Sequence, residues 1–324
     1  MNKFSATHAA FTGFRLIQSK PQIILWWAAV MFVQTVISGG CMILFGGGAL
    51  ARLESPELKN DPTAISAAFA QAAPALLVAS LIGFAVYAVF YAATYRAVLR
   101  PQEDRAGYLR FGVDELLQLG ALLLVGLVVF AAYFGLVLAA VVVIISVAAM
   151  SKVAAVFVGV PVVISAIGAL LFIVVRLSLT NAVAFDTRQI SLPTSWRLTK
   201  GRFWPILGAY MLAAIFAFIV YMLGLTIFMA LAAVTGGVGA AGAVFKPDTT
   251  SMATYFTPIT LIYLVFSALL WPLGLTLLVG PSASIYQSLT AGPTLSLSHR
   301  VQKTVLYIFV SFAVSHTGLL LPSF

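Results

Sequence analysis

The sequence predicts an all-α, polytopic membrane protein with six transmembrane helices, and two observations carry this prediction. Hydrophobic residues make up 62% of the 324 residues and charged residues only 8%, whereas an ordinary soluble domain has roughly 25% charged residues. Six apolar stretches are also long enough to cross a bilayer. They lie near Gln22–Leu50, Ala75–Leu99, Leu116–Met150, Ala155–Ala184, Trp204–Val234 and Phe256–Leu289.

The positions of the 18 Lys and Arg residues indicate how these spans are oriented. When the connecting segments are assigned alternately to two sides, one side holds only Arg52, Lys59, Lys152 and Lys246, and the other holds the remaining fourteen. Because cytoplasmic loops carry the excess of Lys and Arg, we expect both ends of the six-helix unit in the cytoplasm. Attraction to anionic lipids explains the net charge of +9 more simply than nucleic-acid binding does.

The spans are expected to form three hairpins, each preceded by a helix in the cytoplasmic interface. The first such helix has Ser5 as its N-cap and an apolar face from Phe4 to Ile17; the second is Pro101–Glu115 and the third Asp186–Arg202. Aromatic and basic residues are typical interfacial anchors. The anchors predicted here are Phe14, Arg15, Trp196, Arg197, Lys200 and Trp204.

Short internal matches predict a threefold repeat within a single transmembrane domain, residues 1–293. Residues 14–20 align without gaps to residues 196–202, and the ends of the even-numbered spans correspond at Ala93–Arg96, Val183–Asp186 and Ser284–Gln287. The copies would be residues 1–100, 101–188 and 189–293. Residues 294–324 form an atypical tail, in which Thr304–Leu321 is interpreted as a non-spanning segment. The alternatives are a seventh span, a fourth interfacial helix, or a segment foreign to the original fold.

The sequence offers few groups for catalysis or metal binding. All nine acidic residues lie outside the apolar stretches, the three His residues are scattered, and Cys41 is the single cysteine. There is no His-Glu-x-x-His zinc helix, no Gly-x-Ser-x-Gly elbow and no phosphate-binding Gly-rich loop. We therefore expect no catalytic site, no metal and no cofactor.

Arg176 is the strongest candidate for a binding residue. If the fourth span runs to Ala184, Arg176 lies roughly 13 Å inside its cytoplasmic end, where a charge costs about 2.5–3.5 kcal/mol unless it has a partner. The sequence therefore predicts a contact with an anionic lipid or a partner protein, with Thr180 and Asn181 as further donors and Arg96 as a second candidate. The alternative is an Arg that extends to the interface and marks the membrane boundary.

Two other patterns concern helix shape and packing. Pro272 is predicted to kink the last span, which is a feature of solute pathways in transporters and also of ordinary packing. Ala131, Gly135 and Ala139 form a stripe of small residues at four-residue spacing. Such a stripe predicts close helix packing, within the chain or between copies.

One motif carries a family resemblance. Ser195–Trp204, with Val175–Leu179 before it, resembles uncharacterised six-helix inner-membrane proteins of proteobacteria, and is distantly similar to the membrane domain that precedes the catalytic part of some glycerophosphodiester phosphodiesterases. The likeness covers Phe4 to Leu289 in architecture but only short segments in motif. It implies a bacterial inner membrane and a lipid or envelope connection. No stretch resembles the catalytic part, so phosphodiesterase activity is not implied.

Together these observations favour a non-enzymatic inner-membrane protein, either a partner subunit or a lipid-interacting scaffold. Its expected partners are membrane lipids, anionic ones included, and other membrane-protein subunits. The alternative is a passive or secondary transporter for a small or anionic, lipid-like substrate, and a lipid-modifying enzyme is the third hypothesis.

Overall fold

The structure is a computed structural model, which describes residues 5–53, 61–243 and 248–290. All regular elements in these ranges are helices, and six segments are long and apolar enough to cross a membrane. The predicted all-α class and the six helices of spanning length are thus confirmed. The predicted tail, residues 294–324, lies outside the described residues. The long helices are α3 (Gln22–Leu53), α4 (Pro62–Leu99), α5 (Val113–Met150), α6 (Lys152–Leu177), α9 (Phe203–Ala243) and α11 (Pro258–Thr290).

Short helices precede or connect the long ones. The first predicted interfacial helix is divided at Phe11 into α1 and α2, and its predicted cap is correct, because the Ser5 hydroxyl accepts a hydrogen bond from the His8 amide. The third predicted helix, Asp186–Arg202, is shorter than expected: α8 covers Leu192–Thr199 and is capped by Ser191, and residues 188–191 are not helical. The short elements are α1 (Ala6–Ala10), α2 (Thr12–Ser19), the 3₁₀ turn η2 (Ala106–Tyr108), α7 (Thr180–Thr187), α8 (Leu192–Thr199) and α10 (Met252–Tyr255).

The second predicted interfacial helix, Pro101–Glu115, is wrong. Residues 101–112 form a loop with a single 3₁₀ turn, in which Ala106, Gly107 and Tyr108 all have positive φ. This left-handed backbone is stabilised from outside the segment, because Arg96 donates to the Tyr108 carbonyl at 2.6 Å and Trp27 to the Gly107 carbonyl at 2.7 Å. A helix would have used these carbonyls for its own hydrogen bonds.

Several spans differ in extent from the sequence prediction: α4 begins at Pro62 and not near Ala75, and α9 ends at Ala243 and not near Val234. The third span is one uninterrupted helix of 38 residues, α5, about 57 Å long at 1.5 Å per residue, so it is longer than a bilayer core is thick. The fourth span is divided: α6 ends at Leu177, and α7 begins at Thr180. Arg176 therefore lies in the last turn of a helix and not well inside one.

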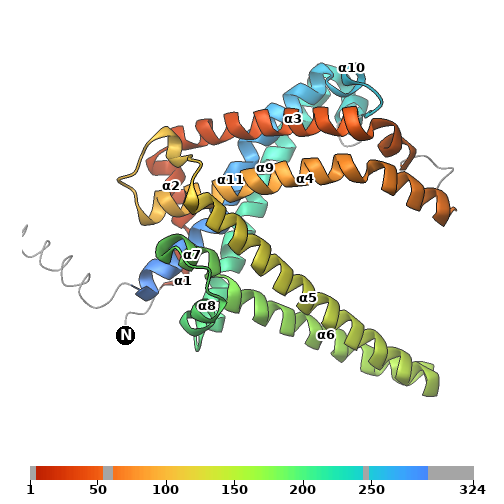
Figure 1. Cartoon of the computed structure of the whole chain (residues 1–324), viewed down its shortest axis with the longest axis vertical. Coiled ribbons are helices and arrows are strands. Elements are labelled where there is room, and N and C mark those ends of the chain that lie inside the picture. The colour runs from red at the N-terminus through yellow and green to blue at the C-terminus, as the bar shows by residue number, and fades with distance from the viewer. Residues whose placement is uncertain (1–4, 54–60, 244–247, 291–324) are drawn as a thin grey trace, which may run out of the picture.

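The molecule is V-shaped, with two arms that meet at one end (Figure 1). One arm contains α3, α4, α9 and α11, in which α3 packs along α4, and α11 packs on α9, α3 and α4. The other arm is the pair α5 and α6. It packs on the rest mainly through contacts of α5 with α4 and α7 and of α6 with α8 and α9.

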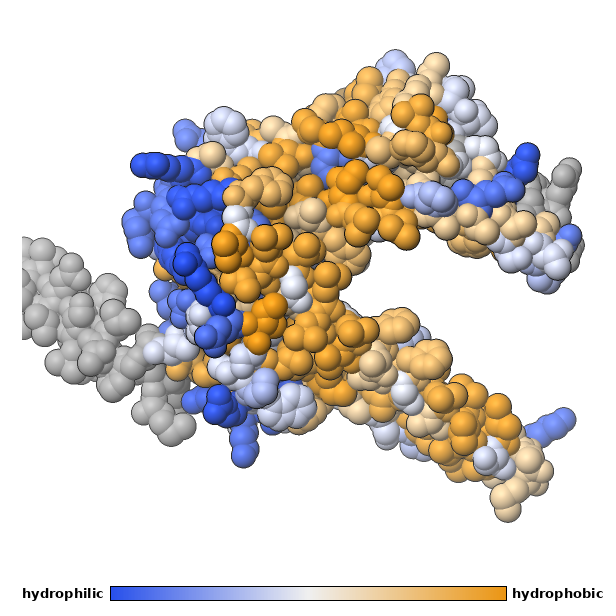
Figure 2. Space-filling model, viewed as in Figure 1, coloured by the Kyte–Doolittle hydropathy of each residue, from blue (hydrophilic) through white to orange (hydrophobic). Residues whose placement is uncertain are grey.

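The buried core lies at the apex of the V, where the ends of the long helices meet α1, α7 and the 101–112 loop. Its largest buried side chains include Trp27, Phe90, Tyr95, Tyr108 and Phe185. Hydrophilic residues gather on the apex surface, while the arms and the space between them are mainly hydrophobic (Figure 2). Exposed apolar side chains of this extent are expected where lipid is the solvent.

Candidate functional site

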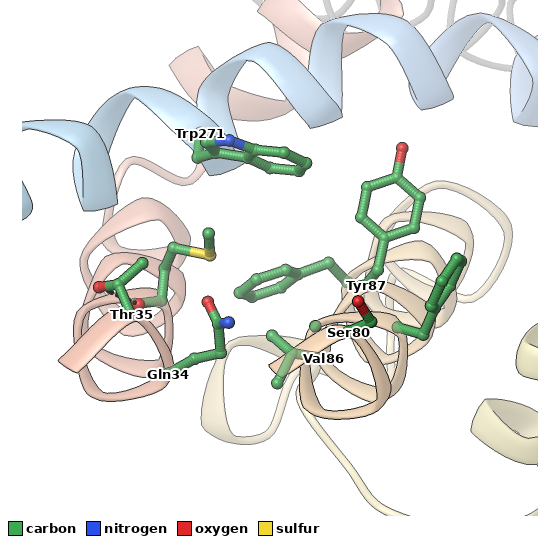
Figure 3. Close-up of a pocket in the computed structure, with 10 residues that line it drawn as sticks. Gln34, Thr35, Ser80, Val86, Tyr87 and Trp271 are labelled. Carbon is green, nitrogen blue, oxygen red and sulfur yellow. Dashed lines mark hydrogen bonds between the residues drawn. The ribbon is translucent and has the colours of Figure 1, made fainter. Parts of the chain in front are cut away.

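The candidate site is a groove in the larger arm, between α3, α4 and α11 (Figure 3). Its cavity measures about 480 Å³, within the range of small-molecule sites. We call it the Gln34 groove, and it is lined by Met31, Gln34, Thr35, Ser80, Gly83, Phe84, Val86, Tyr87, Phe90 and Trp271. The lining is aromatic and aliphatic apart from a few uncharged polar groups, and it contains no Lys, Arg, Asp or Glu.

The groove lies deep within its helices. Gln34 is about 18 Å along α3 from Gln22, and Tyr87 is about 18 Å along α4 from Leu99, at 1.5 Å per residue. These distances exceed half the thickness of a bilayer core of roughly 30 Å. The polar groups of the groove thus lie well inside both helices, away from the ends at Gln22 and Leu99.

Gln34 is the distinctive polar group of the site. Its Nε2 donates to the Ser38 hydroxyl at 3.0 Å, one helical turn further along α3. Its Oε1 is buried and has no hydrogen-bond partner. A buried acceptor without a donor is costly, so this oxygen marks a place where a ligand donor would be stabilised.

The neighbouring hydroxyl, that of Thr35, is already in use. It donates to the carbonyls of Met31 and Phe32 in its own helix, both at 2.9 Å. This back-bonding is common for Thr inside a helix. The unmet hydrogen-bonding capacity beside it is therefore that of an acceptor, Gln34 Oε1.

Tyr87 and Trp271 separate this groove from a second cavity. Their rings meet edge to face, with 5.6 Å between centroids and 78° between planes. The second cavity, about 260 Å³, shares both rings and lies between α4, α9 and α11, with Tyr221, Phe228, Tyr263 and Phe266 among its lining residues. Aromatic rings thus line both cavities, and Tyr87 and Trp271 belong to both linings.

The predicted binding residue Arg96 lies elsewhere, inside the apex. It is 1% exposed and is surrounded by carboxylates: Glu115 at 2.6 Å, Asp114 at 3.4 Å and Glu103 at 3.8 Å. Arg188 and Arg100 also approach Asp114, at 3.4 and 3.5 Å. The anionic partners of Arg96 in this structure are therefore side chains of the same chain.

Arg176 has a different environment. Its guanidinium lies over the rings of Phe172 and Trp196, at 4.8 and 5.4 Å, and donates to the Trp196 carbonyl at 3.5 Å. Its Nε is buried without a partner. The other two predicted donors are placed differently: Thr180 is fully buried, and the backbone carbonyl of Asn181 accepts from Gln118 at 2.9 Å.

Side chains of the motif around Ser195 hydrogen-bond to the backbone where the helix is interrupted between α6 and α7. The Ser195 hydroxyl accepts from the Leu179 amide at 3.2 Å and donates to the Arg176 carbonyl at 2.8 Å. Thr199, one turn later, approaches the same carbonyl at 3.4 Å. Backbone groups freed where the helix is interrupted thus find partners in α8.

The predicted interfacial anchors lie on α2, on α8 and its C-cap, and at the start of α9. Phe14 packs edge to face on Phe216 of α9 at 5.6 Å, and Arg15 donates to the His8 carbonyl at 2.6 Å. Trp196 and Trp204 are 40% and 76% exposed. Arg197 reaches the Thr194 hydroxyl at 3.5 Å, and Lys200 is exposed.

The two features predicted to shape helix packing differ in burial: the stripe of small residues is exposed, and Pro272 is buried. Ala131, Gly135 and Ala139 lie exposed on α5, and a Cβ added at Gly135 would meet no atom within 4 Å. The stripe therefore faces away from the rest of this chain. Pro272 is buried inside α11, which continues through it, and Thr276 donates to its carbonyl at 2.7 Å.

Sequence reasoning did not find the groove. Its polar residue Gln34 lies with Thr35 and Ser38 in an otherwise apolar part of its span, which is a signal that sequence inspection offers. Its other walls come from helices far apart in the chain. In the described residues no group of three or more His, Cys, Asp or Glu residues is placed to hold a metal ion.

No known family model, curated protein or solved structure matches this chain. The resemblance based on the Ser195–Trp204 motif therefore stays a prediction.

Proposed function

We propose that this protein is a non-enzymatic, multi-pass membrane protein that serves as a lipid-interacting scaffold or partner subunit. The observation that carries the proposal is the separation of the two arms beyond the apex. Both arms present large apolar side chains there, such as Leu81 on α4 and Leu127 on α5, which are 61% and 65% exposed. Lipid chains or helices of another subunit would fill this space and stabilise the open V.

The Gln34 groove supports the lipid-binding form of the proposal. It is apolar apart from neutral polar groups, it opens beside the exposed side chains of Phe84 and Trp271, and it lies at acyl-chain depth. A ligand dissolved in the bilayer would enter the Gln34 groove laterally, from the lipid phase. No acid–base pair or nucleophile arrangement lines it, which is why binding is proposed rather than catalysis.

The proposal includes the topology expected from the charge distribution, with three hairpins and both ends of the six-helix unit in the cytoplasm of a bacterial inner membrane. The strongly charged apex then faces the cytoplasm, and α1, α2 and α8 lie near that interface. Equivalent aromatic residues of the three expected copies, Tyr95, Phe185 and Tyr286, share one core at the apex, which supports the threefold repeat. Anionic lipids of the cytoplasmic leaflet are the proposed surface partners.

The alternative function is transport of a small or lipid-like substrate. Pro272 and Pro281 each remove a backbone donor from α11, and Trp271 on that helix lines both cavities. Interrupted helices of this kind line substrate paths in transporters. The scaffold is preferred because the groove lacks charged groups that would bind an ion or an anionic solute.

The test is purification from native membranes with a polymer that keeps the surrounding lipid, followed by native mass spectrometry. The expected result is a fixed set of retained lipids or a stoichiometric subunit. If the protein retains neither, but moves labelled lipid or solute across proteoliposome membranes, the transporter hypothesis replaces the scaffold hypothesis.

The proposed topology has its own test, in which single cysteines in a Cys41→Ser background are labelled with an impermeant thiol reagent. Ser66→Cys is expected to react from outside and Gln189→Cys only after permeabilisation.

A further inference from the structure

We propose that the Gln34 groove selects neutral, hydroxyl-bearing amphiphiles, such as a long-chain or isoprenoid alcohol or a diacylglycerol, whose hydroxyl donates to Gln34 Oε1. This inference rests on the proposed function, because it names the ligand class of the same lipid-exposed site. Three properties of the groove lead to it: an unmet acceptor, the absence of charge, and apolar walls at acyl-chain depth.

The unmet acceptor determines which end of a ligand binds. Gln34 Nε2 is held by Ser38 at 3.0 Å, which fixes the amide and leaves its oxygen buried without a donor. An ester or a ketone brings only acceptors and leaves this oxygen unpaired, whereas a hydroxyl supplies the missing donor. In a medium of low dielectric constant, that single hydrogen bond separates the two kinds of ligand.

The absence of charge excludes ionised headgroups. Neither a Lys nor an Arg lines the groove to neutralise a phosphate or a carboxylate, and an unpaired ion at this depth is strongly disfavoured. Fatty acids and phospholipids are therefore expected to place their headgroups elsewhere. A neutral alcohol has no such cost.

The walls suit the rest of the ligand. Met31, Phe84, Val86, Phe90 and Trp271 supply apolar walls to the 480 Å³ space, and a hydrocarbon chain is bound by such surfaces without directional contacts. Trp271 is 47% exposed, so the chain can extend from the groove into the surrounding lipid. Trp271 also supplies an optical probe inside the site.

The experiment measures quenching of Trp271 fluorescence in nanodiscs by chains brominated near their middle. The probes are a long-chain alcohol, the alkane of equal length and the corresponding methyl ether. Subtracting the signal of the Trp271→Phe variant isolates this tryptophan from the other four. The alcohol is expected to bind about fivefold more tightly than the alkane or the ether, the effect of one hydrogen bond.

Gln34→Leu is expected to abolish this preference, and Gln71→Leu, the same substitution at an exposed position of α4 outside the groove, is expected to retain it. Continued quenching of Gln34→Leu by the alkane shows that the groove is still formed. Competition by unlabelled diacylglycerol and by an isoprenoid alcohol distinguishes the natural sources of the hydroxyl.

Equal quenching by alcohol and alkane in the wild type would overturn the selectivity and leave the lipid-binding function standing. A preference for the alcohol that persists in Gln34→Leu would also overturn the selectivity alone. If no probe quenches Trp271, both the selectivity and the lipid-binding groove are wrong.

Discussion

The guanidinium of Arg96 donates a 2.6 Å hydrogen bond to the carboxylate of Glu115, and both side chains are almost completely buried. Arg96 lies near the end of α4 and Glu115 in the first turn of α5. The pair therefore joins the two arms of the V at the apex. The same guanidinium binds the Tyr108 carbonyl at 2.6 Å, so one side chain holds both helices and the loop between them.

Removing this cation is expected to destabilise the protein strongly. Arg96→Met leaves the buried Glu115 carboxylate without its counter-ion, and breaking a buried pair in this way costs about 3–5 kcal/mol. Unfolding in mixed detergent and SDS micelles measures the change. The control is Arg110→Met, which breaks an exposed pair with Glu103 and is expected to cost less than about 1 kcal/mol. Similar losses in the two variants would contradict a structural role specific to Arg96.

The sequence was sufficient for the six long helices because a bilayer imposes a minimum length of apolar chain, and the six stretches meet it. The loop that contains Gly107 was not predictable in the same way. Its left-handed backbone depends on donors from Trp27 and Arg96, which lie on α3 and α4. The local sequence of residues 101–115 suggests a helix through its charged and aromatic residues, while Gly107 and Gly112 are the residues that disfavour one.

The position of Arg176 shows a second limit. The apolar run continues past it to Ala184, so the sequence indicates one span, whereas the helix is interrupted at Ser178 and Leu179. The break is stabilised by Ser195, which lies on another helix. The groove was missed for the same reason, since Gln34 and Trp271 meet only through the tertiary packing of α3 and α11.

A close approach between α2 and α11 provides a test of the packing at the apex. A Cβ added at Gly13 would lie 2.6 Å from the Thr276 carbonyl oxygen and 2.8 Å from the Leu277 Cα. Gly13→Ala is therefore expected to push α2 away from α11, with a loss of about 1–3 kcal/mol, measured by the same SDS unfolding.

The matched control is Gly208→Ala on α9, where an added Cβ meets nothing within 4 Å. There the higher helix propensity of Ala is expected to stabilise the protein by about 0.5–1 kcal/mol. The opposite signs of the two Gly→Ala changes are the prediction. Stabilisation by both would show that α2 does not pack on α11 as described.

Ser195→Ala tests whether the Ser195 hydroxyl stabilises the interruption between α6 and α7. The substitution leaves the Leu179 amide without its acceptor and reduces the contacts of the Arg176 carbonyl in a buried setting, with an expected cost of about 1–3 kcal/mol. Ser146→Ala, which removes an exposed hydroxyl bonded only within its own helix at Val142, serves as the control. Hydrogen exchange should show faster exchange of the Leu179 amide in Ser195→Ala alone. Unchanged exchange there would exclude Ser195 as the stabilising group.

Arg176→Gln tests the predicted contact with anionic lipid. The Arg176 side chain packs on Phe172 and Trp196 but leaves most of its five donors without a strong protein acceptor, since its bond to the Trp196 carbonyl is 3.5 Å long. Losing one charge-assisted hydrogen bond to a phosphate is expected to weaken binding of phosphatidylglycerol about tenfold. Binding of phosphatidylethanolamine should change less, because its net charge is zero. Titration followed by native mass spectrometry measures both, with Arg110→Gln as the control. If Arg176→Gln and Arg110→Gln bind phosphatidylglycerol equally, Arg176 serves only to pack α6 against α8, and the anionic site lies elsewhere.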